Sequence, residues 1–186
     1  MRIIGGLARG IRLEAGSNPE TRPTTDRLKE TLFNMIGCLE GDVVADIFAG
    51  SGALGLEALS RGAEKVYFIE NDRKTCEVIK SNYQKVKKSM GGSCGEVQII
   101  TADWRQGLKQ LNDDLDVIIS DPPYGDDSEF ARAMLSSEEL IKKCHQNSFL
   151  VLEHLTKSRL DSQVWKSVKV KHCPPTSFSF FEIKNG

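Results

Sequence analysis

Three glycines with a fixed spacing constrain the fold of this chain more than any other feature. Gly50, Gly52 and Gly55 form the pattern G-x-G-x-x-G, directly after the apolar run 43–48 and at the start of a helical stretch at 53–61. Glycine permits a tight turn and lets a ligand approach the backbone closely. The spacing therefore predicts a strand–turn–helix unit that binds a nucleotide-like ligand.

The rest of the chain alternates between strands and helices. Four further apolar runs are typical of buried parallel strands: 66–69, 97–100, 117–119 and 149–152. A long helical stretch at 73–90 separates two of them, whereas the runs 168–171 and 178–183 are too close together for a helix and predict an antiparallel pair. We expect an open, seven-stranded, mostly parallel α/β sheet with an antiparallel C-terminal strand, and a ligand beyond the carboxyl ends of its strands.

The segment before this sheet has its own pattern. Residues 1–14 alternate apolar and polar positions around glycines and predict a small N-terminal β-hairpin. A helix is expected after the N-cap types Thr24, Thr25 and Asp26. A length of 186 residues suits a single domain, here divided into a hairpin arm at 1–20, a helical segment at 21–40 and a core at 41–186.

Composition excludes several classes of protein. The formal net charge is −1 and no apolar stretch approaches the roughly 18 residues of a membrane span. The five cysteines contain no C-x-x-C pair, and His145, His154 and His172 are not at metal-ligand spacing. We therefore expect a cytoplasmic protein with no secretory signal, no membrane partner and no metal.

Two acidic residues flank the predicted ligand loop. Glu70 ends the second strand, where a carboxylate binds the ribose of an adenosine. Asp46 lies just before the glycines, where it disfavours a pyrophosphate and suits an ammonium or sulfonium group. This favours S-adenosylmethionine over a nicotinamide cofactor without excluding the latter.

A second motif follows the fourth predicted strand. Asp121, Pro122, Pro123 and Tyr124 stand together at its carboxyl end, where the prolines fix the backbone and leave carbonyls free to accept hydrogen bonds. The Asp121 carboxylate and the Pro122 carbonyl can take the two hydrogens of a base's exocyclic amine, and Tyr124 offers a face for stacking. We predict that this tetrapeptide is catalytic.

Taken together, the motifs resemble those of a known family. The glycine loop and the tetrapeptide look like those of S-adenosylmethionine-dependent amino-methyltransferases. The segments 2–6 (RIIGG), 22–34 (RPTTDRLKETLFN) and 48–58 (FAGSGALGLEA) are similar to the bacterial small-subunit ribosomal RNA guanine-N2 methyltransferase family. The match runs from residue 2 to about residue 124, with Tyr124 where the family can carry Phe.

The resemblance implies a Rossmann-like methyltransferase fold, S-adenosylmethionine as cofactor, and methylation of the exocyclic N2 amine of a guanine. Its implied partner is ribosomal RNA, within an assembling small subunit. It also implies cofactor-binding roles for Asp46, Phe48, Ala49, Gly50, Ser51, Gly52, Glu70, Asn71, Asp103 and Trp104.

RNA contact is expected from the amino-terminal part of the chain. Arg2, Arg9 and Arg12 form a basic group without an acid before Glu14, and Arg22 and Thr24 are expected to approach the cofactor or the RNA.

Three other functions remain open at this point. An adenine-N6 methyltransferase acting on DNA or RNA uses the same tetrapeptide, although this chain has no room for a large target-recognition insert. A nicotinamide-dependent oxidoreductase explains the glycines and Glu70 but gives the tetrapeptide no role. A non-catalytic RNA-binding module explains neither motif.

Overall fold

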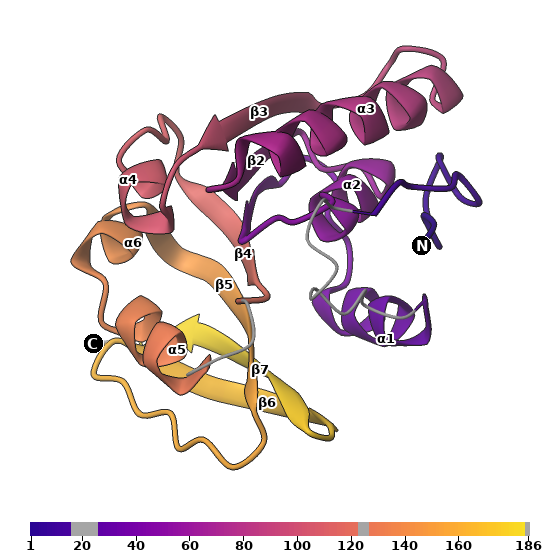
Figure 1. The fold of residues 1–186 in the computed structure, drawn as a ribbon. Helices are drawn as coiled ribbons and strands as arrows, with labels where there is room; N and C mark the ends of the chain where they lie inside the picture. The colour runs from indigo at the N-terminus through magenta and orange to yellow at the C-terminus, as the bar shows by residue number, and fades with distance from the viewer. Residues whose placement is uncertain (16–25, 123–126, 185–186) are drawn as a thin grey trace.

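The computed structural model describes residues 1–15, 26–122 and 127–184 (Figure 1). The predicted site residues Arg22, Thr24, Pro123 and Tyr124 lie outside these ranges. The helices are α1 Asp26–Ile36, α2 Ala53–Ser60, α3 Arg73–Ser89, α4 Trp104–Leu108, α5 Asp127–Leu135 and α6 Glu138–Lys142. The strands are β1 Val43–Ile47, β2 Lys65–Glu70, β3 Glu96–Thr101, β4 Leu115–Ser120, β5 Cys144–Leu155, β6 Trp165–Cys173 and β7 Thr176–Ile183.

These strands form one seven-stranded sheet in the order β3-β2-β1-β4-β5-β7-β6. Strands β1 to β5 pair in parallel, and β7 runs antiparallel to both β5 and β6. This confirms the mostly parallel sheet with an antiparallel C-terminal strand. The strand order reverses next to β1, which places the carboxyl ends of β1 and β4 at the switch point where such sheets bind ligands.

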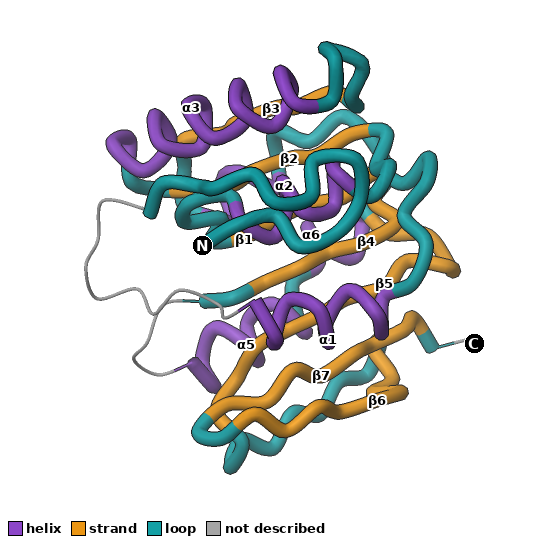
Figure 2. Tube along the Cα trace, turned by 90° about the vertical axis from the view of Figure 1, so that its right-hand side faces the viewer, coloured by secondary structure: helices purple, strands orange, loops and turns teal. Residues whose placement is uncertain are grey.

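Two apolar layers cover the two faces of the sheet. Helices α1, α2 and α3 pack on one face together with the N-terminal segment, through side chains such as Leu32, Leu56 and Ile79. Helices α4, α5 and α6 pack on the other face through side chains such as Leu108 and Met134. Figure 2 shows α1, α2 and α3 on the side of the sheet that faces the viewer.

The N-terminal segment is a hairpin-shaped loop rather than a regular β-hairpin. Its ladder is a single antiparallel bridge between Arg2 and Arg12. Ile3 still bonds across the hairpin, through its N–H to the Ile11 carbonyl and through its carbonyl to the Gly10 N–H, but the backbone from Ile4 to Ala8 bonds to helix α2 instead. The Glu57 carboxylate accepts the N–H groups of Ile4 at 2.8 Å and Gly5 at 2.7 Å, while Ser60 Oγ accepts the Ala8 N–H.

Strand β5 is longer than the apolar run 149–152 predicts, because it begins at Cys144. Its first residues are polar and join β4 through a register shift between Leu115 and Val117, so no hydrophobic pattern marks them. No helix in the described part of the chain is long and apolar enough to cross a membrane.

Candidate active site

The glycine loop leaves the carboxyl end of β1 in left-handed backbone conformations. Gly50 and Gly52 have φ values of 53° and 77°, which glycine adopts at little cost, and Gly52 directly precedes α2. An added Cβ on Gly50 would meet only the Phe48 carbonyl oxygen, at 4.0 Å. The surface of the loop at Gly50 is therefore bare backbone, open to a ligand.

Glu70 is held in place at the end of β2 by this loop. Its carboxylate accepts the Gly50 N–H and the Asp72 N–H, each at 2.9 Å. The Ala49 N–H donates to the Ile69 carbonyl at 3.1 Å, which ties the loop to the same strand. A carboxylate that is half-exposed and fixed by two N–H groups keeps further lone pairs for a hydroxyl pair of a ribose.

Asp46 lies beneath the loop. Its residue is 1% exposed, and its carboxyl accepts the Gly55 N–H at 2.8 Å, inside the first turn of α2. Burial raises the pKa of Asp46 to about 8, against the opposing effect of the Gly55 hydrogen bond. In this structure Asp46 shapes the loop, and direct contact with a cofactor remains a prediction.

Phe48 connects the loop to the opposite face of the sheet. It is the one non-glycine residue with positive φ, 61°, among the described residues, a conformation that costs of order 1–3 kcal/mol. Its ring contacts Phe130 of α5 edge-on, with centroids 5.3 Å apart, and lies 6.5 Å from the Trp104 ring. Aromatic packing offsets part of this strain.

The predicted adenine-side residues differ in exposure. Asn71 is exposed, and Asp103 is exposed as the N-cap of α4, where its side chain accepts the Arg105 N–H. Trp104 is 2% exposed within the apolar layer under α4. Its indole packs in the core, and its predicted contact with adenine remains a prediction.

The glycine loop and the predicted catalytic motif start side by side. Ile47 of β1 pairs with Ser120 of β4, so the next residues, Phe48 and Asp121, leave adjacent strands at the same level. Neighbouring strands are about 4.8 Å apart. Asp121 is half-exposed and Pro122 is buried. The sheet thus brings together two motifs that are more than 60 residues apart in sequence.

The predicted RNA-binding arginines divide into two groups. Arg2 pairs with Asp26 at 2.7 Å, an acid that is distant in sequence. Arg9 and Arg12 are exposed, and within the described residues neither forms an ion pair. Glu14, which follows them, pairs with Lys85 at 2.6 Å. Arg9 and Arg12 are therefore the arginines of this segment that are most available to a ligand.

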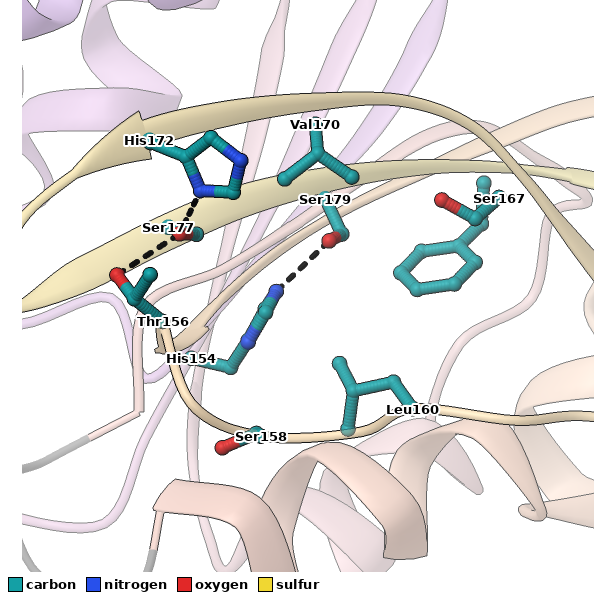
Figure 3. Close-up of a pocket in the computed structure, with 10 residues that line it drawn as sticks. His154, Thr156, Ser158, Leu160, Ser167, Val170, His172, Ser177 and Ser179 are labelled. Carbon is teal, nitrogen blue, oxygen red and sulfur yellow. Dashed lines mark hydrogen bonds between the residues drawn. The ribbon is translucent and has the colours of Figure 1, made fainter.

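A polar cavity of about 210 Å³ lies farther along the sheet, between the end of β5, strands β6 and β7, and the loop after β5 (Figure 3). His172, Ser177 and Thr156 form a hydrogen-bonded chain along it. His154 is buried there between Ser179 Oγ, at 2.7 Å, and the Leu155 carbonyl. These are the contacts of a structural histidine, the role that the sequence favours for His154.

Comparisons with known proteins agree with this arrangement. Residues 1–182 match the family model described as Conserved hypothetical protein 95. The chain is 34% identical to Ribosomal RNA small subunit methyltransferase D from Haemophilus influenzae, over 98% of this chain and 93% of that protein. It is 38% identical to the protein of the same name from Escherichia coli K12, over 83% of this chain and 72% of that protein.

A solved structure from Escherichia coli, described as the methyltransferase yhhF, superposes with a TM-score of 0.78 at 29% identity, covering 100% of this chain and 99% of that one. The shared fold extends over the glycine loop, the end of β4 and the antiparallel C-terminal strands. The chain belongs to the Conserved hypothetical protein 95 family and is a methyltransferase of the Rossmann-like fold.

Proposed function

We propose that this protein transfers a methyl group from S-adenosylmethionine to the exocyclic N2 amine of a guanine in small-subunit ribosomal RNA. The observation that carries the proposal is the register between β1 and β4, which starts the glycine loop and the Asp121 motif at one level on adjacent strands. The names of the relatives supply the substrate class. The partner is then the assembling small subunit, in the cytoplasm.

The residues present fit this cofactor. The bare backbone at Gly50 accommodates the methionine part, and the Glu70 carboxylate, fixed by two N–H groups, accepts hydrogen bonds from the ribose hydroxyls. When bound, S-adenosylmethionine supplies a methyl group activated by its sulfonium.

On the substrate side, the chain positions and polarises the amine. The Asp121 carboxylate and the Pro122 carbonyl accept its two hydrogens, which draws the nitrogen lone pair out of conjugation with the ring. Holding the amine in line with the methyl group contributes up to about 7–11 kcal/mol of barrier reduction. The base has to leave its stack to reach this edge of the sheet, at a cost of a few kcal/mol.

The test is a methylation assay on small-subunit RNA or particles from cells that lack the gene. Radiolabelled S-adenosylmethionine and nucleoside mass spectrometry identify the product. We expect N2-methylguanosine from the wild-type protein, almost none from Asp121→Ala, and near-normal cofactor affinity of Asp121→Ala by calorimetry. N6-methyladenosine as the product, or binding of NAD in place of S-adenosylmethionine, would contradict the proposal.

Tyr124 provides a second variant pair for the same assay. Tyr124→Phe should stay active because the ring provides the stacking surface, whereas Tyr124→Ala should lose most of its turnover. Equal activity of the two variants would show that the Tyr124 ring does not stack on the target base.

A further inference from the structure

A buried carboxylate stands near the end of β5, beside the predicted catalytic motif. Glu153 is 8% exposed. Within residues 1–15, 26–122 and 127–184, no hydrogen bond or ion pair reaches its side chain. Among the described residues, the fully buried polar side-chain atoms without a hydrogen-bond partner are the indole nitrogens of Trp104 and Trp165, so the Glu153 oxygens keep contact with solvent. Glu153 is therefore an unpaired acceptor, largely covered by protein, that a donor group of a ligand can reach.

The register of the sheet places Glu153 next to Asp121. Ser120 of β4 pairs with Leu152 of β5, so Asp121 and Glu153 follow at the same level on adjacent strands. Alternation along β5 puts Glu153 on the face of Val151, which packs with the layer under α1 and α2. Because β4 lies between β1 and β5, Glu153 is on the side of Asp121 away from the glycine loop. That is the side on which a base stands when its amine points toward the methyl donor.

The chemistry of the two candidate bases differs at the atom next to the reacting amine. Guanine carries an N1–H donor beside its N2 amine, whereas adenine has an unprotonated N1, an acceptor, beside its N6 amine. An ionised carboxylate only accepts hydrogen bonds. It therefore accepts a hydrogen bond from the N1–H of guanine and repels the N1 lone pair of adenine.

We propose that Glu153 is a specificity-determining residue that accepts the N1–H of the target guanine while Asp121 and the Pro122 carbonyl hold its N2 amine. This inference rests on the proposed function and deepens it, because it names the group that selects guanine over adenine. A site built to bond a donor rejects an analogue that lacks the donor far more strongly than an apolar pocket does. The preference for guanine has two sources: guanine gains a hydrogen bond from its N1–H to Glu153, and adenine leaves the Glu153 carboxylate facing an acceptor.

The experiment uses RNA in which 2-aminopurine replaces the guanine that the methylation assay identifies. This base keeps the C2 amine but has an acceptor at N1. Wild-type protein should methylate it with a kcat/KM lower by about 10²-fold, the scale of one mismatched base contact. A wild-type rate equal to that on guanine would overturn the inference, whether or not any variant folds.

Glu153→Gln should then weaken the preference for guanine, because its amide N–H₂ can donate to the N1 of 2-aminopurine. We expect the ratio of kcat/KM on guanine to that on 2-aminopurine to fall by at least 10-fold, with cofactor affinity by calorimetry unchanged. Glu182→Gln, at an exposed glutamate of β7, is the matched control and should keep the wild-type ratio. An unchanged ratio in Glu153→Gln, or a loss of cofactor affinity in its place, would overturn the inference. Absence of N2-methylguanosine with the wild-type protein would instead refute the proposed function.

Discussion

The buried Asp46 makes the stability of this protein depend on pH in a calculable way. Its pKa is about 8 in the folded chain, because burial disfavours the charged form, and near 4 in an unfolded chain. Between these values the folded state binds one proton more than the unfolded state. The stabilisation is fully present below pH 4, and it is lost as pH rises toward 8.

The magnitude follows from linkage. One proton corresponds to about 1.4 kcal/mol per pH unit, so the free energy of unfolding should fall by about 2.5 kcal/mol between pH 5 and pH 7 on account of Asp46 alone. Asp46→Asn removes the titration but keeps an oxygen to accept the Gly55 N–H. The difference in stability between wild type and Asp46→Asn should therefore shrink by this amount over the same interval.

Urea denaturation of the cofactor-free protein at pH 5, 6 and 7 provides the measurement, with equal m-values required for both proteins. Asp114→Asn, which removes an exposed carboxylate, controls for the change in net charge. Parallel pH profiles for wild type and Asp46→Asn, within about 0.5 kcal/mol, would show that Asp46 ionises normally when folded and would refute the reasoning.

Three further predictions concern stability and RNA binding. Glu57→Ala should lower the free energy of unfolding by about 3–5 kcal/mol, because the carboxylate binds two backbone N–H groups of the N-terminal segment and an arginine; chemical denaturation measures it. Gly55→Ala should cost about 1–3 kcal/mol in the same assay, because its Cβ would lie 2.4 Å from a ring carbon of Phe68. Arg9→Glu with Arg12→Glu should weaken RNA binding and flatten the slope of log affinity against log salt by about 0.7–0.9 per lost phosphate contact, at unchanged cofactor affinity.

Two of these predictions have a matched control. Glu64→Ala removes an exposed glutamate and should leave stability within about 0.5 kcal/mol. Lys109→Glu with Lys142→Glu changes the charge equally on the face covered by α4 and α6, and should keep the wild-type salt slope. If the double variant of Arg9 and Arg12 keeps the wild-type slope of log affinity against log salt, the RNA binds at another surface.

The sequence predicted the sheet well because its signals are local. Short apolar runs and the glycine spacing each arise within a few residues, and the strands lie within a few residues of the expected positions. The start of β5 escaped prediction because its pairing with β4 depends on a register shift that no local pattern encodes.

The site was predictable only in part, because contacts between distant residues determine it. The sequence predicted that Glu70 binds a ribose. It did not predict that the Glu70 carboxylate accepts the Gly50 N–H, because this hydrogen bond joins residues that are distant in sequence. Arg2 was expected to be available to RNA, yet it pairs with Asp26 across a distance in sequence. Glu57 and Glu153 were missed, although a lone glutamate within or next to an apolar run marked both.

The attachment of the N-terminal segment to the glycine loop has a consequence for which bases of a bound RNA can reach the site. Asn82 accepts the Glu14 N–H and donates to the Glu14 and Ser51 carbonyls, so the segment and the glycine loop share one support. The segment that carries Arg9 and Arg12 is therefore tied to the loop that the proposed function assigns to the methyl donor. If Arg9 and Arg12 bind an RNA phosphate, as we predict, this attachment limits the distance between that phosphate and the base that can be methylated.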